Sequence, residues 1–171
     1  LVWLDPLGFN NAFAMVVTGE KARELGLRTI SDLRDHPELR YGISLEFLER
    51  ADGWVPLLEA YGLPRDGLTV RGLQHGLAYE ALSAGHIDVT NAYTTDGKLE
   101  RYGLVTLEDD RGFFPPYHAA PVVRGEVLRS HPEVARVLSL LAGRLTDQEM
   151  QHLNYRVEER KESFAAVAAD L

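Results

Sequence analysis

The sequence from Asn91 to Arg124 reads NAYTTDGKLERYGLVTLEDDRGFFPPYHAAPVVR, and it sets two tyrosines where apolar runs meet turn residues. The run before Tyr93 predicts a buried strand, and TTDG after it predicts a turn that caps a short helix. Two prolines before Tyr117 force an extended chain that leads into the apolar run AAPVV. Both phenols are therefore expected at strand ends, where open α/β sheets place ligand sites. The alternative is that each ring packs in the core with its hydroxyl paired.

Strand and helix patterns alternate along most of the chain. They predict strands over residues 13–18, 41–44, 68–73, 87–92 and 104–107, and helices or helical turns over residues 19–27, 29–33 and 74–84. Asp52 is expected to cap a further helix, whose apolar face carries Val55, Leu58 and Tyr61. Such alternation predicts an α/β layered sheet. After Arg124 the apolar residues keep helical spacing and no strand pattern returns, so the rest of the chain is expected to be helical.

Composition narrows the function classes. The 171 residues suit one domain, or one domain with an appendage, and 45% hydrophobic residues allow a buried core. A net charge of −8 with scattered basic residues argues against nucleic acid as a partner, and the absence of cysteine excludes disulfides and thiolate chemistry. The sequence holds no run of about 18 apolar residues and no signal-peptide layout. It begins with LVWL, an apolar start that predicts a piece of a longer protein.

No catalytic or metal-binding set stands out. Ser83, His86 and Asp88 lie close in sequence, but they lack the strand-turn-helix setting of a nucleophile, and His86 is expected in a loop. Glu149 and His152 form one Glu-x-x-His pair, whereas a di-iron bundle needs two, so Glu149 is expected on a helix surface. There is also no glycine-rich phosphate-binding loop. The sequence therefore predicts no metal and no cofactor.

Arg50 and Phe13 are further candidates for ligand contact. Arg50 precedes a predicted helix, so its guanidinium and the free N–H groups of that helix can together hold a carboxylate. The alternative is a surface arginine paired with Glu46 or Glu49. Phe13 stands at the entrance to the first predicted strand, where its ring is either a ligand face or part of the core. Aromatic faces plus one arginine suit a ligand with a cationic head and an anionic tail, such as a betaine.

Several segments resemble one protein family. They are LGFNNAFAMVV, TISDL, EFLERADGWVPLLEAYGL, GLAYEALSAGHIDVTNAYTTDG, LEDDRGFFPPYHAAPVVR and LTDQEMQHLNYRV. The chain resembles the substrate-binding proteins of osmoprotectant ABC importers, which take up glycine betaine, carnitine, choline or related quaternary amines. The resemblance implies one lobe of a type II periplasmic-binding-protein-like fold, a three-layer α/β/α lobe, plus a C-terminal helical segment. It implies solute binding without catalysis.

The resemblance also implies the site. In that family two lobes close on the ligand, tyrosines box in the quaternary ammonium, and an arginine of the second lobe holds the carboxylate. By position, Tyr93 and Tyr117 match two tyrosines of the box and Arg50 matches the arginine. Phe13 falls where the family has a tyrosine, so the ring face is kept and a hydroxyl is lost. These four residues are the predicted substrate-binding residues.

Domain organisation and partners follow from the same resemblance. Residues 1–123 are expected to form the second α/β lobe with its hinge strands, and residues 124–171 to form helices that pack on a first lobe, most of which this chain lacks. The expected partners are a quaternary amine, an ABC transporter permease, and either the missing first lobe or a second copy of the chain. The expected place is outside the cytoplasm, in a periplasm or on a membrane-anchored lipoprotein. The chain alone is then a half-site that binds betaine weakly or not at all.

Two other function classes stay open at this point. A sensory or regulatory ligand-binding lobe on the same scaffold would be recognised by the domains that flank it. A two-lobed α/β enzyme would need an acid–base or nucleophile set, and the sequence offers none.

Overall fold

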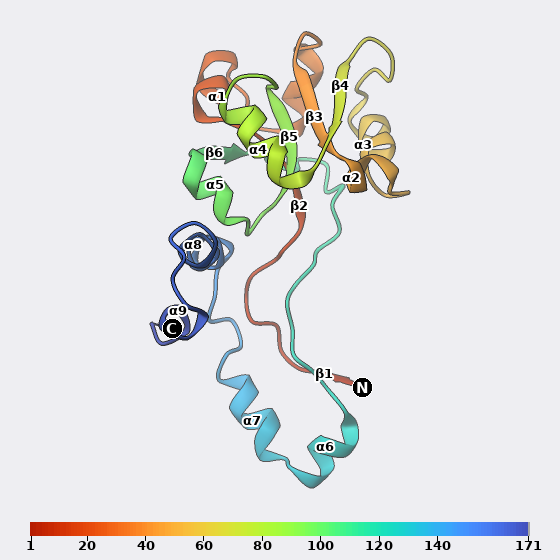
Figure 1. Cartoon of the computed structure of the whole chain (residues 1–171). Helices are drawn as coiled ribbons and strands as arrows, with labels where there is room; N and C mark the ends of the chain where they lie inside the picture. The colour runs from red at the N-terminus through yellow and green to blue at the C-terminus, as the bar shows by residue number, and fades with distance from the viewer. Residues whose placement is uncertain (171) are drawn as a thin grey trace.

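The fold is built on a five-stranded mixed sheet in a computed structural model that describes residues 1–170, with strand order β4-β3-β5-β2-β6 (Figure 1). The strands are β2 (Phe13–Thr18), β3 (Arg40–Ser44), β4 (Thr69–Leu73), β5 (Val89–Tyr93) and β6 (Leu104–Thr106). β3 is parallel to β4 and β5, whereas β2 is antiparallel to β5 and β6. The carboxyl ends of β3, β4 and β5 therefore meet the amino end of β2 at one edge of the sheet.

Helices cover both faces of this sheet. Side chains alternate between the two faces along each strand, so one strand can contribute to two buried clusters. On β2, Phe13 and Met15 join one buried cluster, whereas Val16 joins another. The first cluster receives side chains from α1 (Gly19–Leu25), the 3-10 helix η1 (Ile30–Asp35), α2 (Leu45–Glu49) and α3 (Trp54–Tyr61). The second receives them from α4 (His75–Ser83) and α5 (Gly97–Tyr102). The predicted α/β/α lobe is thereby confirmed.

Local sequence explains where these helices begin and end. Thr18, Thr29 and Ser44 are N-caps, and each side chain accepts a hydrogen bond from a backbone amide of the first turn. α1 and α3 end at Gly26 and Gly62, whose φ angles of 69° and 65° lie in the left-handed region that glycine adopts readily. The strands and helices predicted for this lobe are present within a few residues of their expected bounds.

Two details of the predicted helix near Asp52 are wrong. Its N-cap is Gly53, which makes no side-chain hydrogen bond, and the Asp52 carboxylate binds Arg50 instead. Val55 is 40% exposed rather than buried, because Trp54 anchors the first turn in the core and the next residue then points outward. The buried face of α3 consists of Trp54, Leu57, Leu58 and Tyr61.

Tyr93 is the last residue of β5, as predicted, but Tyr117 is not at a strand end. Tyr117 lies in an extended segment before β7 (Val122–Val123), where an isolated bridge joins the following residue to Asn10. β7 is short because its partner, β1 (Val2–Trp3), has only two residues.

Two extended segments, residues 4–12 and 114–121, leave the main sheet side by side, and we call them the connecting segments (Figure 1). Backbone hydrogen bonds join them: the Leu7 amide donates to the Ala119 carbonyl at 2.8 Å, and the Asn11 amide to the Tyr117 carbonyl at 3.1 Å. They end at the small β1–β7 sheet, which lies apart from the main sheet (Figure 1).

The chain after Arg124 is helical in the described residues, as predicted. The helices are α6 (Gly125–Ser130), α7 (Glu133–Ser139), α8 (Asp147–Glu158) and α9 (Phe164–Ala168). α6 and α7 lie at the end far from the main sheet, whereas α8 packs beside α5 (Figure 1). That residues 124–171 pack on a first lobe stays a prediction. Within residues 1–170, no helix has the length and apolar character needed to cross a membrane.

The Tyr41 hydroxyl gives a test of the core. It is buried without a hydrogen-bond partner in residues 1–170, and its ring centroid lies 5.3 Å from that of Trp54. Tyr41→Phe keeps the ring contact and removes the unsatisfied hydroxyl, so we expect the free energy of unfolding to rise by about 1 kcal/mol. Tyr61→Phe, which removes a hydroxyl that donates to Asp109, is expected to lower it by about 1–2 kcal/mol. Urea unfolding measures both; equal destabilisation would contradict this account.

Candidate ligand-binding site

Phe13 and Tyr93 face each other at the edge of the sheet. Phe13 begins β2 and Tyr93 ends β5, and antiparallel pairing sets the two residues directly opposite each other. Their ring centroids are 4.6 Å apart. The guanidinium carbon of Arg50, which follows α2, lies 5.3 Å from the centroid of the Phe13 ring. Three of the four predicted site residues therefore meet at this edge.

A cavity of about 390 Å³ opens beside these three residues. Tyr117 reaches it from the second connecting segment, where its backbone amide donates to Asn10 Oδ1 at 2.5 Å and the residue is 43% exposed. The lining residues are Phe9, Asn11, Phe13, Glu46, Arg50, Tyr93, Tyr117 and Ala119. The structure thus brings all four predicted residues to one cavity, and their binding of a substrate stays a prediction.

Phe13 belongs to the core and to the cavity wall together. It is buried, and its ring centroid lies 5.0 Å from that of Phe47 and 6.3 Å from that of Phe114. The two interpretations of this ring from the sequence are therefore compatible, because one face packs inward while the residue still lines the cavity.

Four lining residues are missing from the sequence prediction. Glu46 has a local signal, because it lies four residues before Arg50, the spacing at which side chains on a helix meet. Phe9, Asn11 and Ala119 lie in the connecting segments. The course of these segments follows no periodic pattern, so nothing in the sequence points to their place at the cavity.

Arg50 is already paired with carboxylates. Its Nε and Nη2 donate to the two oxygens of Asp52 at 2.8 Å each, and its Nη1 lies 3.6 Å from Glu46. These bonds hold the pKa of Asp52 below its ordinary value, so Asp52 stays charged. The alternative from the sequence, an arginine paired with Glu46 or Glu49, is therefore met by Glu46, and Asp52 is an additional partner. None of the lining residues belongs to α3, so the helix amides predicted to assist Arg50 are not at the wall.

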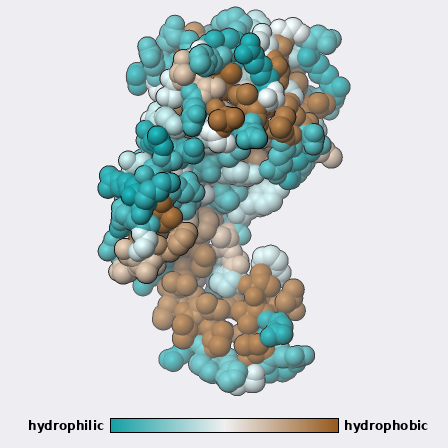
Figure 2. All heavy atoms as spheres, in the orientation of Figure 1, coloured by the Kyte–Doolittle hydropathy of each residue, from teal (hydrophilic) through white to brown (hydrophobic). Residues whose placement is uncertain are grey.

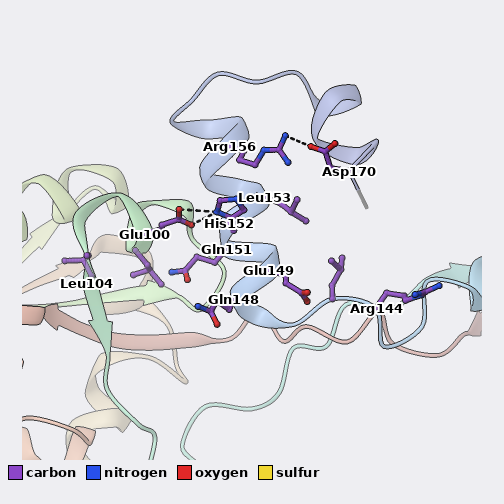
Figure 3. A pocket seen from close by; sticks show the side chains of 13 residues that line it. Glu100, Leu104, Arg144, Gln148, Glu149, Gln151, His152, Leu153, Arg156 and Asp170 are labelled. Carbon is purple, nitrogen blue, oxygen red and sulfur yellow. Dashed lines mark hydrogen bonds and ion pairs between the residues drawn. The ribbon is translucent and has the colours of Figure 1, made fainter.

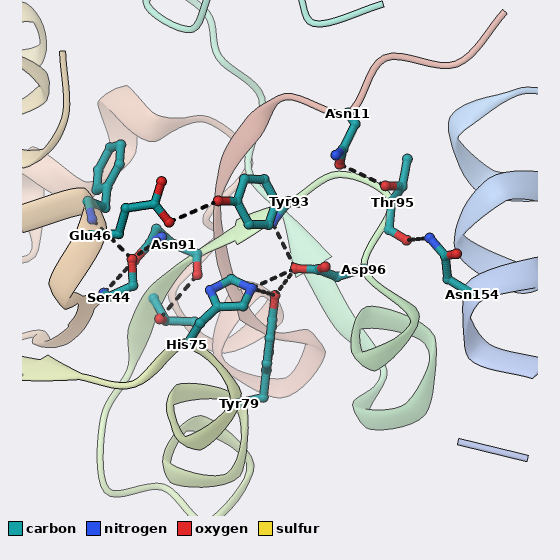
Figure 4. Close-up of polar contacts among 12 residues, drawn as sticks. Asn11, Ser44, Glu46, His75, Tyr79, Asn91, Tyr93, Thr95, Asp96 and Asn154 are labelled. Atoms are coloured by element: carbon teal, nitrogen blue, oxygen red, sulfur yellow. Dashed lines mark hydrogen bonds and ion pairs between the residues drawn. The ribbon is translucent and has the colours of Figure 1, made fainter. Parts of the chain in front are cut away.

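Tyr93 is held by a polar network, shown in Figure 4. Its backbone amide donates to Asp96 at 2.9 Å and its hydroxyl donates to Glu46 at 3.3 Å. The Asp96 carboxylate also accepts from the Tyr79 hydroxyl and lies 3.0 Å from His75 Nε2. Burial raises the pKa of Tyr93, and the nearby Glu46 carboxylate raises it further. The phenol therefore stays neutral and keeps its proton.

A buried pair joins the end of β3 to the middle of β5. Asn91 Oδ1 accepts from the Ser44 amide at 2.7 Å, and Asn91 Nδ2 donates to Ser44 Oγ at 3.0 Å. Because Ser44 is the N-cap of α2, this pair fixes the start of the helix that carries Glu46 and leads to Arg50.

Three of the residues considered for catalysis or metal binding, Asp88, Glu149 and His152, make other interactions. Asp88 forms an ion pair with Arg40 at 2.7 Å, and Glu149 completes the capping box that begins α8. His152 Nδ1 lies 3.0 Å from Glu100, at the wall of a larger polar cavity of about 790 Å³ between α5 and α8 (Figure 3). Among residues 1–170, no cluster of acidic and histidine side chains is arranged to hold a metal ion.

Comparison with known proteins identifies the family. Residues 1–171 match the family described as the substrate binding domain of the ABC-type glycine betaine transport system. The chain belongs to this family. The resemblance predicted from the sequence is confirmed, and this is a family of transporter substrate-binding domains, not of enzymes.

Individual relatives agree with this family. A glycine-betaine-binding protein of Pseudomonas aeruginosa is 40% identical over 180 residues, which cover 99% of this chain and 58% of the relative. The carnitine transport binding protein OpuCC of Listeria monocytogenes is 35% identical over 170 residues, which cover 98% and 54%. A crystal structure of a glycine betaine/carnitine/choline ABC transporter matches with a TM-score of 0.91 at 39% identity, over 99% of this chain and 62% of that one. The chain thus spans little more than half the length of these relatives.

The charge of Asp96 gives a pH-dependent test of the network. Burial alone raises the pKa of Asp96, but hydrogen bonds from His75, Tyr79 and the Tyr93 amide outweigh it and hold that pKa below its ordinary value. Because this pKa is lower in the folded state, the ionised carboxylate stabilises the fold at pH values above its unfolded-state pKa of about 3.9. This contribution is lost as the pH falls through the folded-state pKa.

Asp96→Asn is therefore expected to lower the free energy of unfolding by about 2 kcal/mol at neutral pH, and by less once the pH falls below about 3.9. Asp66→Asn, at an exposed aspartate, is the control. Urea unfolding across this range measures both variants. A stability difference that stays constant with pH would show that the Asp96 charge is not what the network depends on.

Proposed function

We propose that the chain captures glycine betaine or a related quaternary amine, such as carnitine or choline, for an ABC importer. The observation that carries this proposal is that four aromatic residues, Phe9 among them, and one arginine come from separate parts of the chain to line one cavity. Phe13 and Tyr93 come from the sheet edge, Tyr117 from a connecting segment and Arg50 from the end of α2. Membership in a transport family supports the same function.

The rings are proposed to hold the cationic head. A quaternary ammonium has no N–H to donate, so ring faces suit it better than hydrogen-bond acceptors, and each well-placed ring contributes about 0.5–2 kcal/mol. Tyr93 and Tyr117 supply such faces, and Phe13 adds a face without a hydroxyl. Glu46 brings a negative charge to the same wall, which favours a cation further.

Arg50 is proposed to hold the anionic tail. A ligand carboxylate would either displace Asp52 from the guanidinium, or bind Nη1 while Asp52 keeps Nε and Nη2. Because Asp52 and Glu46 already neutralise Arg50, the carboxylate gains only the difference between the two pairings. Glycine betaine and carnitine, the solutes in the names of the two relatives, each combine a quaternary ammonium with a carboxylate, which fits this division of the cavity.

We propose further that residues 1–123 are the second lobe of a two-lobed protein and that residues 124–171 return to a first lobe, with α8 also packed on α5 of the second lobe. Trp3, in β1, is 72% exposed, and Leu140, at the end of α7, is 66% exposed. Figure 2 shows hydrophobic surface gathered at the end of the molecule where Figure 1 places β1 and α7. A first lobe, or a second copy of the chain, would cover this surface. The share of the relatives that the chain spans supports the same organisation.

The proposed function includes a place and a partner. A substrate-binding domain of an importer meets its solute outside the cytoplasm, in a periplasm or on a lipoprotein, and delivers it to a permease. Transport is preferred over a sensory lobe because the matching family is described as part of a transport system.

Arg50→Ala is expected to weaken glycine betaine binding about 10-fold and choline binding less than about 3-fold, because only betaine carries a carboxylate. Tyr93→Ala removes a ring face and is expected to weaken both ligands alike. Arg65→Ala, at an exposed arginine paired with Glu59 outside the cavity, is the control. Calorimetric titration of the full-length protein measures all three. Equal losses for the two ligands in Arg50→Ala would rule out the carboxylate contact.

The half-site has its own test. The 171-residue chain alone is expected to bind glycine betaine with a Kd above about 1 mM, whereas the full-length protein binds about 1000-fold more tightly, because only the closed lobes surround the ammonium. Calorimetry measures both, and sedimentation of the isolated chain reports its self-association. Micromolar binding by a monomer of the isolated chain would rule out the half-site.

A further inference from the structure

Helix α8 contacts the connecting segment before β2 and the loop that follows Tyr93. Asp147 and Asn154 lie about two turns apart on α8, so they share one face of the helix. Asp147 bonds to the connecting segment before β2, and Asn154 bonds to the loop after β5. Neither of these two residues lines the cavity.

Asp147 holds Asn10, and Asn10 holds the segment of Tyr117. The Asp147 carboxylate accepts the backbone N–H of Asn10 at 2.6 Å, and Asn10 Oδ1 accepts the backbone N–H of Tyr117 at 2.5 Å. The hydroxyl of Thr94, the residue after Tyr93, donates to the Asn10 carbonyl at 2.5 Å. Asn10 therefore joins the start of α8, the loop after β5 and the segment that carries Tyr117.

Asn154 holds the loop after β5 from the same helix face (Figure 4). Its Nδ2 donates to the Thr95 carbonyl at 2.8 Å, and the Thr95 hydroxyl donates to Asn11 Oδ1 at 2.8 Å. Thr95 is buried, so water competes little for these bonds. Asn11 in turn lines the cavity.

The backbone of α8 also packs closely on α5. A Cβ on Gly97 would lie 2.5 Å from the backbone nitrogen of Tyr155 and 2.7 Å from its Cα, closer than non-bonded atoms approach. His152 and Glu100 meet across the same interface, as Figure 3 shows. The position of α8 relative to the sheet edge is therefore fixed by backbone contact as well as by polar side chains.

We propose that α8 is a brace for the ligand cavity, with Asp147 and Asn154 as its positioning residues. Tyr117 lies on an extended segment outside any strand, so the main sheet alone does not fix its distance from Tyr93. The brace sets that distance by holding the Tyr117 segment through Asn10 and the loop after Tyr93 through Asn154. This inference rests on the proposed function and extends it: affinity for a quaternary ammonium depends on a helix that does not touch the ligand.

Asp147→Ala and Asn154→Ala in the full-length protein are each expected to weaken glycine betaine and choline binding by the same factor, about 3–10-fold. The factor is the same because ring spacing serves both ligands, unlike the carboxylate contact of Arg50. Asp147→Asn is expected to restore binding, since its amide oxygen still accepts the Asn10 N–H. Gln148→Ala, at the next and exposed residue of α8, is the matched control.

Gly97→Ala tests the brace without removing either positioning side chain. Its Cβ collides with the α8 backbone, so it is expected to weaken both ligands as well. Gly76→Ala, in the first turn of α4, is the control, because the nearest atom to its Cβ would be Lys98 Nζ at 3.9 Å.

A ligand-free measurement accompanies the calorimetry. Amide hydrogen exchange at Tyr117 is expected to quicken in Asp147→Ala, to return to the wild-type rate in Asp147→Asn and to stay at that rate in Gln148→Ala. A general loss of stability would instead quicken exchange throughout the lobe.

The outcomes separate the two proposals. A wild-type protein that binds no quaternary amine overturns the proposed function and the brace together. Wild-type binding with unchanged affinity in Asp147→Ala, Asn154→Ala and Gly97→Ala overturns the brace alone. A loss that is confined to glycine betaine, or that Asp147→Asn does not restore, also overturns the brace.

Discussion

The antiparallel pairing of β2 with β5 is the constraint on which the cavity depends. It sets Phe13 opposite Tyr93, and it continues past the strand ends, where the Thr94 amide donates to the Ala12 carbonyl at 3.0 Å. β2 enters this edge from a connecting segment, so the same pairing brings Asn11 to the cavity. α2 begins at the neighbouring end of β3 and adds Glu46 and Arg50. The ends of the strands thus place Phe13, Tyr93, Glu46 and Arg50, and the connecting segments complete the cavity wall.

The electrostatics of the cavity depend on one arginine and the two carboxylates beside it. Arg50 is the one arginine at the wall, among the described residues, and Asp52 and Glu46 both lie against it. Its positive charge is thus balanced before any ligand enters, and the remaining acidic and aromatic wall suits a cation. A zwitterion meets both conditions, since its tail replaces one carboxylate at the guanidinium while its head meets the rings.

Small polar side chains carry the links between distant parts of the chain. Asn10, Thr95 and Asn91 each join segments that are far apart in sequence, and each donates or accepts through a short side chain that leaves little freedom. The hydrophobic clusters form the two faces of the lobe, whereas these polar contacts fix how the strand edge, the connecting segments and α8 meet. The relative positions of the residues that line the cavity therefore depend on the polar contacts.

The sequence by itself determined the alternating strands and helices, the family, and the four residues Phe13, Arg50, Tyr93 and Tyr117 that meet at one cavity. Local periodicity and caps such as Thr29 suffice to predict the strands and helices. Motifs such as AYTTDG suffice to predict the family and the four residues. Only the tertiary structure decided that Asp52 pairs with Arg50 instead of capping α3, that Tyr117 lies outside a strand, and that α8 packs on α5. Each of these depends on which segments of the folded chain come into contact. Several segments are chemically suitable partners, and the sequence pattern near a residue holds no information on which of them the fold brings within reach.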